Sequence, residues 1–172
     1  MTQSVELLLG DEAEAAVRER WRRLAEARLP SMAHHQGETN RPHVTLAVAD
    51  TLDEATETRL SALTGWLPLT VTLGGLIAFG SARQRVLALL VVPTVGLLEL
   101  QRAAAELMPA PVQHLTADRW TPHVTLARRV KVEELGAAAQ AVGDLPELTT
   151  TCPAVRRWDS DARRTWLLAD SR

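Results

Sequence analysis

The hexapeptide Pro-His-Val-Thr-Leu-Ala occurs twice in this chain of 172 residues, at positions 42–47 and 122–127. Valine, threonine and leucine favour an extended backbone, in which residues i and i+2 project from the same face of a strand. We therefore expect His43 and Thr45 on one face of the first strand, and His123 and Thr125 on one face of the second. The intervening valine and leucine would face the core. A fold that joins two such strands presents two imidazoles, each with a neighbouring hydroxyl.

The segments around the two motifs follow the same order in each half of the chain. We expect helices over 12–27, 50–63, 95–108 and 132–142, and strands over 4–9, 69–79, 85–92, 148–158 and 163–169, besides the two motif strands. This order indicates an internal duplication, with repeats of about 1–92 and 93–172 in a single bilobal domain, 1–172. The predicted fold class is α+β: two pseudo-symmetric lobes of antiparallel sheet with outer helices, whose motif strands face a central cleft.

Composition narrows the class of protein. Hydrophobic residues make up 46% of the chain and charged residues 23%, as in soluble globular proteins, and no apolar run reaches the roughly 18 residues of a membrane span. The N-terminal segment has no basic stretch, so we expect no secretory signal, a cytoplasmic location and no membrane partner. The single cysteine, Cys152, excludes a disulfide framework, and a net charge of −2 disfavours long duplex DNA as a partner. We expect a monomer.

Histidine exchanges protons readily near neutral pH, so two imidazoles across a cleft can act as a base and an acid. This pair suits in-line displacement at phosphorus, in which the threonine hydroxyls bind the non-bridging oxygens as their charge builds. No metal or cofactor is needed, and the motif strands carry no third histidine or carboxylate for a metal site. Arg128 follows His123 by five residues and could bind phosphate, although it has the opposite strand parity unless a β-bulge re-aims it.

The paired His-Val-Thr-Leu elements and the duplicated strand and helix order resemble the 2H phosphoesterase superfamily, in particular the branch of 2′-5′ RNA ligase and RNA 2′,3′-cyclic phosphodiesterase (LigT-like). The resemblance covers essentially the whole chain. It implies opening of RNA 2′,3′-cyclic phosphate ends to a 2′-phosphate, with His43 as proton donor to the 3′ oxygen and His123 as the base that activates water. By the same resemblance Thr45, Thr125 and Arg128 bind the substrate phosphate, and the partner is an RNA 3′ end or a small cyclic nucleotide.

Some members of the family that this chain resembles have an aromatic residue against the terminal base; here either Trp120 or Phe79 would serve, or base stacking is weak. Trp21, Trp66, Trp158 and Trp166 are interpreted as core or lobe-interface residues. The arginines of 156–164 would either attract an RNA backbone or form a solvated hairpin.

Other functions stay open at this stage. The reverse reaction, sealing of 2′-5′ linkages, is accessible to the same site. The substrate could instead be another cyclic nucleotide or a 2′,5′-linked oligonucleotide, because the motif recognises only the phosphate. A protein of another class, a nucleotide-binding sensor or scaffold without turnover, would keep the fold but would have no use for two proton carriers.

Overall fold

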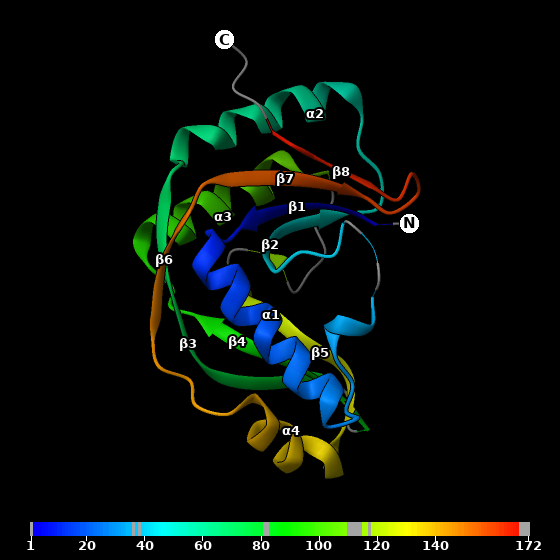
Figure 1. The fold of residues 1–172 in the computed structure, drawn as a ribbon. Helices are drawn as coiled ribbons and strands as arrows, with labels where there is room; N and C mark the ends of the chain where they lie inside the picture. The colour runs from blue at the N-terminus through cyan, green and yellow to red at the C-terminus, as the bar shows by residue number, and fades with distance from the viewer. Residues whose placement is uncertain are drawn as a thin grey trace.

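A curved antiparallel β-sheet forms the centre of the molecule (Figure 1). The computed structural model describes residues 2–35, 37, 39–80, 83–109, 115–116 and 118–168, and within these residues eight strands pair in the order β6-β3-β4-β5-β2-β1-β7-β8. The strands are β1 (Gln3–Leu8), β2 (His43–Ala49), β3 (Leu69–Gly80), β4 (Gln84–Val91), β5 (His123–Lys131), β6 (Leu148–Cys152), β7 (Ala154–Asp159) and β8 (Arg164–Leu167).

Two pairs of helices pack on the sheet, α1 (Asp11–Glu26) with α4 (Leu135–Val142) on one half and α2 (Glu54–Leu60) with α3 (Val95–Leu107) on the other half. Short 3₁₀ helices are η1 (Met32–His34), η2 (Ser61–Trp66) and η4 (Val132–Glu134). Helix α1 packs against α4, β5 and β6, whereas α3 packs against β2, α2 and η2. In Figure 1, α1 crosses the front of β4 and β5, and α2 lies above β7 and β8. The expected α+β class with outer helices is confirmed.

Local sequence accounts for the helix boundaries. Side chains that recur at helical spacing on α1 are fully or almost fully buried, from Ala13 to Leu24. The side chain of Asp53 accepts the backbone N–H of Thr56 and caps α2, and Thr94 caps α3 in the same way. The predicted helix over 50–63 is shorter than expected, because α2 gives way to η2.

The division of the sheet differs from the division of the chain that the sequence predicts. Strands β3 and β4 both precede residue 92, yet they pair with β6 and β5 from the second half, while β7 pairs with β1. The strand order is symmetric about the junction of β2 and β5, and the expected boundary of the repeats near residue 92 stays a prediction. Each half of the sheet, on either side of the β2–β5 junction, therefore contains strands from both halves of the chain. The interpretation of 1–172 as one bilobal domain stays a prediction.

The predicted strand over 148–158 is in fact two strands that lie far apart in the sheet. Pro153 separates β6 from β7, and it has no N–H to donate to a neighbouring strand. β6 pairs with β3 at one edge, and β7 pairs with β1 on the other side of the junction. This crossing ties the C-terminal part of the chain to both sides of the sheet (Figure 1).

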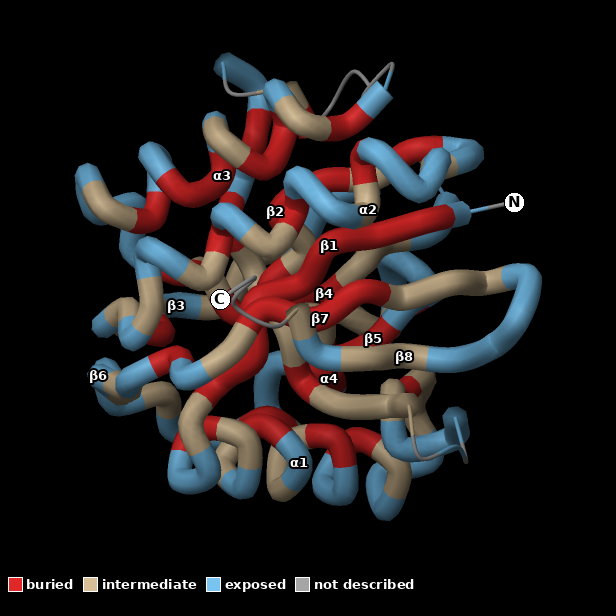
Figure 2. Tube along the Cα trace, turned by 90° about the horizontal axis from the view of Figure 1, so that it is seen from above, coloured by how far each residue is buried: buried red, intermediate tan, exposed pale blue. Residues whose placement is uncertain are grey.

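The core follows the central strands, where Figure 2 shows β1 buried along its whole length. Cys152 is buried among apolar side chains, and burial raises the pKa of its thiol to about 12. Trp21 is in the core as predicted, but Trp66 is 37% exposed, so its interpretation as a core residue is wrong. Among the described residues, no helix combines the length and apolar character that a membrane span needs.

Gly10 permits the close approach of α1 to β6. A Cβ atom at this position would lie 2.7 Å from the carbonyl oxygen of Thr151 and 2.8 Å from Oγ1 of Thr150. We expect Gly10→Ala to lower the free energy of unfolding by about 1–3 kcal/mol, because backbone atoms must shift to relieve the overlap. Urea denaturation measures this change.

Gly136→Ala is the matched control for this prediction. A Cβ atom on Gly136, in α4, has no neighbouring atom within 4 Å. Because alanine favours helix over glycine by about 1 kcal/mol, this variant should be as stable as wild type or more so. Equal stability of the two variants would contradict the packing argument at Gly10.

Candidate active site

The two motif strands are neighbours at the centre of the sheet. β2 and β5 run antiparallel and pair at Val44 and Val124. The residues on either side of such a pair lie across from one another, so His43 faces Thr125 and Thr45 faces His123. These four side chains are partly exposed, whereas the alternate side chains of both strands are completely buried: Val44, Leu46, Val124 and Leu126. Folding thus places both histidines and both threonines on one face, as expected.

Both imidazoles are oriented by a backbone carbonyl two residues earlier. Nδ1 of His43 lies 2.7 Å from the carbonyl oxygen of Arg41, and Nδ1 of His123 lies 2.7 Å from that of Thr121. A carbonyl oxygen only accepts, so each Nδ1 carries the hydrogen and donates it. This leaves Nε2 of each ring as the nitrogen that can accept a proton. A proline follows each accepting residue, so the two motifs hold their rings in the same way.

A β-bulge follows the threonine in both strands. Thr45 and Ala47 pair with Glu6 and Val5 of β1, which leaves Leu46 as the extra residue. β5 has a bulge of the same form, with Leu126 as the extra residue opposite β4, and a second register shift follows between Ala127 and Val130. Each bulge buries a Leu and the following Ala on the core side of the strand. The next residue, Val48 in β2 or Arg128 in β5, therefore lies on the opposite face.

The bulge brings Arg128 to the histidine and threonine face. Arg128 lines a pocket of about 400 Å³, which we call the polar pocket, together with His43, Thr45 and Val48. Val48 is the residue of β2 that corresponds to Arg128 in β5. The expected position of Arg128 therefore depends on an irregularity that strand alternation alone does not show.

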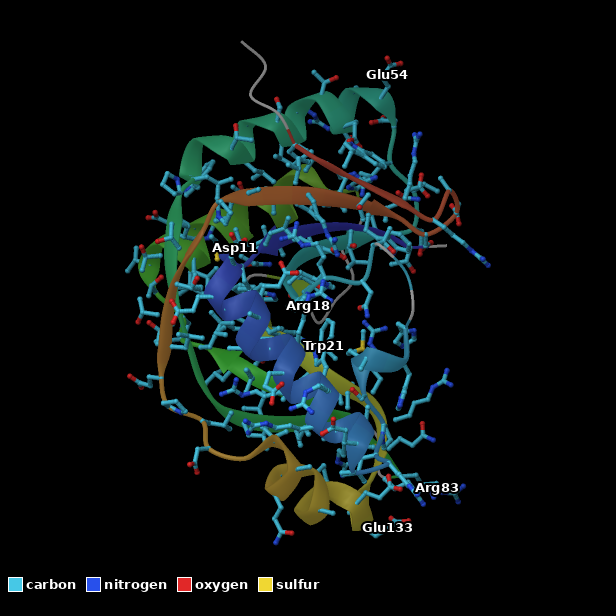
Figure 3. All side chains as sticks on the ribbon, in the orientation of Figure 1. Asp11, Arg18, Trp21, Glu54, Arg83 and Glu133 are labelled. Carbon is cyan, nitrogen blue, oxygen red and sulfur yellow. The ribbon has the colours of Figure 1, made fainter. Side chains whose placement is uncertain are left out.

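Buried donors hold the backbone of the motif strands. The indole Nε1 of Trp21, in the middle of α1 (Figure 3), donates to the carbonyl oxygen of Thr125 at 3.0 Å. Nε1 of Trp120 donates to the carbonyl oxygen of Thr45, also at 3.0 Å. From α3, the buried amide of Gln101 donates to the carbonyl oxygen of Leu46 in the first bulge. Each motif strand is thus fixed by side chains from outside its own strand.

A buried charge pair lies beside His43. Nε of Arg156 donates to Glu6 at 2.7 Å, and each of these side chains is only 5% exposed. The hydroxyl of Ser4 donates to the other oxygen of Glu6, which also lies 3.5 Å from Nε2 of His43. A guanidinium nitrogen of Arg156 lies 3.5 Å from Nδ1 of His43, and we treat this as a contact because that Nδ1 already donates to Arg41.

The charges of this cluster stabilise Glu6 in its ionised form. Burial by itself raises the pKa of Glu6, but the positive charges of His43 and Arg156, with hydrogen bonds from Ser4 and Arg156, lower it below the ordinary value of 4.5. Sequence reasoning missed Glu6 and Ser4 as site residues, and it considered Arg156 only as a contact to an RNA backbone. Alternation along β1 places Ser4 and Glu6 on the face opposite Val5 and Leu7, and two buried polar residues on one face of a strand are the signal that could have found them.

The wall beside His123 is apolar. Relative to the two motif strands, Ala88 of β4 occupies the place of Glu6, since it pairs with Thr125 as Glu6 pairs with Thr45. Ile77 of β3 pairs with Ala88 as Arg156 pairs with Glu6. His123 lies in a pocket of about 310 Å³ that is lined mainly by apolar side chains, and its ring meets Phe79 edge-on at 4.8 Å between centroids. The site is thus symmetric in backbone and asymmetric in chemistry.

The aromatic candidates have different outcomes. Trp120 is only 8% exposed and uses its N–H within the fold, so it is not a platform for a base. Phe79 is 39% exposed beside His123 and remains available. Trp158, interpreted as a core or interface residue, lines the polar pocket with His43. His114 lies outside the described residues.

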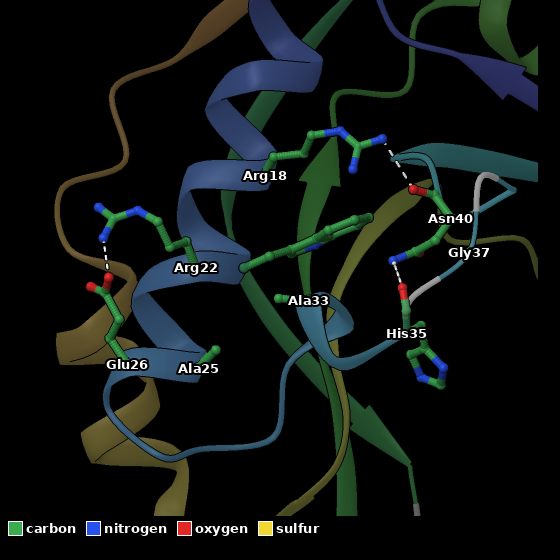
Figure 4. Close-up of a pocket in the computed structure, with 9 residues that line it drawn as sticks. Arg18, Arg22, Ala25, Glu26, Ala33, His35, Gly37 and Asn40 are labelled. Atoms are coloured by element: carbon green, nitrogen blue, oxygen red, sulfur yellow. Dashed lines mark hydrogen bonds and ion pairs between the residues drawn. The ribbon is translucent and has the colours of Figure 1, made fainter.

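Another hollow, of about 490 Å³, lies between α1 and the loop that leads to β2, and it includes none of the motif residues (Figure 4). There Arg18 donates to the carbonyl oxygen of Asn40, and the side-chain amide of Asn40 donates to the carbonyl oxygen of His35. These hydrogen bonds hold the loop against α1. In the described part of the chain, no three His, Cys, Asp or Glu side chains are grouped as metal ligands.

Comparison with known proteins places this architecture in a family. The family model described as the 2′-5′ RNA ligase superfamily matches residues 11–164, and the chain belongs to this superfamily. Membership supports an enzyme of the phosphodiesterase type. No curated protein sequence matches.

Solved structures of related fold cover nearly the whole chain. The apo form of E. coli LigT is 18% identical, with a TM-score of 0.54 over 97% of this chain and 94% of that chain. Kluyveromyces marxianus Usb1 is 13% identical, with a TM-score of 0.55 over 98% of this chain and 97% of that chain. E. coli LigT complexed with phosphate is 22% identical, with a TM-score of 0.53 over 97% and 96% of the two chains. At these identities the likeness concerns the fold alone.

We expect Glu6→Gln to destabilise the protein in a pH-dependent way. At pH 7 the variant leaves Arg156 buried without its counter-charge, which should cost about 3–5 kcal/mol of unfolding free energy. Because the pKa of Glu6 is lower in the folded state, its contribution is present above the unfolded value of 4.5 and is lost as the pH falls through the folded value. Urea denaturation at pH 7 and near pH 3 should therefore show a smaller difference from wild type at the lower pH.

Glu19→Gln provides a surface control, since Glu19 pairs with Arg22 and Arg23 on the exposed face of α1. Solvent screens this pair, so the control should change stability far less than Glu6→Gln at pH 7. An equal loss for Glu6→Gln at both pH values would show that shape, and not charge, is what Glu6 supplies.

Proposed function

We propose that this protein is a metal-independent phosphodiesterase that opens RNA 2′,3′-cyclic phosphate ends and leaves a 2′-phosphate. The observation that carries the proposal is the junction of β2 and β5, where two histidines and two threonines share one face and both histidines present Nε2. Family membership supports it. Related structures of E. coli LigT with 3′-AMP and of Kluyveromyces marxianus Usb1 with uridine monophosphate show nucleotides bound to this fold.

In the proposed reaction, Nε2 of His123 takes a proton from water as the water oxygen bonds to phosphorus. The bond from phosphorus to the 3′ oxygen breaks, and Nε2 of His43 gives its proton to that oxygen. The hydroxyls of Thr45 and Thr125 bind the non-bridging oxygens, and Arg128 compensates their growing charge. The Glu6 carboxylate, 3.5 Å from Nε2 of His43, compensates a positive charge on the imidazole of the donor. If the 5′-hydroxyl of a second RNA attacks in place of water, His123 takes the hydroxyl proton, the bond to the 3′ oxygen breaks as before, and the site would seal a 2′-5′ linkage.

Replacement of either histidine tests the acid and base roles. We expect His43→Ala and His123→Ala each to lower kcat for an RNA with a 2′,3′-cyclic phosphate end by roughly 10²–10⁴-fold, because each removes one proton transfer. Activity of the wild type should persist in excess chelator. Loss of wild-type turnover in chelator would point to a metal mechanism, and binding without turnover in the wild type would favour a sensor.

The product identifies which histidine is the donor. With His43 as the proton donor to the 3′ oxygen, the product carries a 2′-phosphate, which can be separated from the 3′ isomer by chromatography. A 3′-phosphate would require that the two histidines exchange roles.

Arg128 can be compared with its neighbour in the same strand. We expect Arg128→Gln to lower kcat/KM by roughly 10²-fold, since it removes a cationic donor from the phosphate. Arg129→Gln changes the net charge equally, and Arg129 is exposed like Arg128 but does not line the pocket that holds His43. Steady-state kinetics of the two variants should therefore differ. Similar losses would indicate an effect of overall charge and not a contact of Arg128.

A further inference from the structure

A basic groove continues from the polar pocket across β7 and β8. It has a volume of about 510 Å³, and we call it the arginine groove after four of its lining residues: Arg41, Arg156, Arg163 and Arg164. Thr39 and Arg156 line both the groove and the pocket that holds His43. The described residues that line the groove include no Asp or Glu. The two cavities therefore form one continuous surface that begins at the candidate site.

Two of the four arginines supply the unbalanced positive charge. Arg41 pairs with Glu14, and Arg156 pairs with Glu6. Arg163 and Arg164 are exposed, and neither has a carboxylate within ion-pair distance among the described residues. The far end of the groove thus attracts anions, although the whole chain has a net charge of −2.

The side chain of Arg164 is held in place before any ligand binds. Its guanidinium lies over the ring of Trp166 at 5.1 Å from the centroid, and the guanidinium of Arg157 lies 5.3 Å from the same ring. Glu57 accepts hydrogen bonds from Nε1 of Trp166 and from Nε of Arg157, both at 2.8 Å. A guanidinium that lies over an indole ring can still direct its N–H groups outward to a phosphate. Because its side chain is already held, it loses less conformational entropy when the phosphate binds.

The side chains beside the two histidines differ in polarity and charge, and this difference indicates how a ligand would be oriented. The pocket beside His123 is lined mainly by apolar side chains, together with Arg119, and carries the exposed ring of Phe79, which suits a nucleobase. The wall beside His43 is charged and leads into the arginine groove, which suits further phosphates. A free cyclic mononucleotide has a single phosphate and would leave the groove unused.

We propose that the arginine groove binds internucleotide phosphates of single-stranded RNA, so that an oligonucleotide end is preferred over a free cyclic mononucleotide. The proposal rests on the function proposed above for its orientation, but the groove is testable by binding alone. A phosphopeptide would present similar charge without stacked bases, and it serves as a competitor class in the test.

Fluorescence anisotropy with a labelled 2′-O-methyl RNA hexamer carrying a 3′-phosphate tests the groove without any turnover. We expect the wild type to bind the hexamer at least tenfold more tightly than it binds adenosine 3′-monophosphate. The double variant Arg163→Gln/Arg164→Gln should weaken hexamer binding by roughly tenfold, and the slope of log K against log salt should fall by about 0.7 for each phosphate that the variant no longer neutralises.

A matched variant controls for net charge. Arg28→Gln/Arg102→Gln removes the same two charges from exposed positions that do not line the groove, and it should bind the hexamer as the wild type does. Equal weakening by the two double variants would overturn the proposal. Equal affinity of the wild type for the hexamer and the monophosphate, or for the hexamer and a phosphopeptide of equal charge, would also overturn it.

Kinetics separate this proposal from the proposed function. For the wild type, kcat/KM should be higher for a hexamer with a 2′,3′-cyclic phosphate end than for 2′,3′-cyclic AMP, and Arg163→Gln/Arg164→Gln should reduce that ratio by roughly tenfold. Arginine-dependent binding of the hexamer without turnover would support the groove and refute the function. Turnover of both substrates at equal kcat/KM, unaffected in ratio by the variant, would refute the groove and leave the function intact.

Discussion

The contact between β2 and β5 is the constraint on which the rest of the site depends. Val44 and Val124 are its one paired position, and both are completely buried. With these side chains in the core, His43, Thr45, His123 and Thr125 must all lie on the opposite face. A shift of one residue in either strand would bury one histidine and separate the pair. Buried donors on both sides, Trp21 to β5 and Trp120 to β2, oppose such a shift because they bind specific carbonyl oxygens.

The scaffold is symmetric, but its two walls are not. The same backbone positions hold Glu6 and Arg156 beside one histidine and Ala88 and Ile77 beside the other. Two proton-transfer groups in equivalent frames need different surroundings if one is to act as an acid and the other as a base. The charged wall extends into the arginine groove, whereas the apolar wall ends at Phe79. An asymmetric substrate can therefore bind in one orientation at a pseudo-symmetric centre.

Much of the fold was predictable from local patterns. The motif strands, the hairpin of β3 and β4, and helices α1 and α3 agree with periodicity and turn residues within a few positions. The errors arose where a long-range pairing decides the outcome. Pro153 could be recognised as a break in a strand, but nothing local shows that β6 and β7 belong to different sides of the sheet. Likewise, nothing in the linear order shows that each half of the sheet contains strands from both halves of the chain.

The sequence by itself determined which face of each motif strand carries the chemistry, because alternation of apolar and polar residues along a strand is a local property. Each motif also repeats the same spacing around a proline, and in the structure the carbonyl before that proline orients both histidines alike. Only the tertiary structure decided that Glu6 and Arg156 meet beside His43, since they are 150 residues apart in sequence. It also decided that bulges turn Arg128 toward the site and that Trp120 is buried. These outcomes depend on strand order and register, which are set by the packing of the whole sheet and not by any one segment.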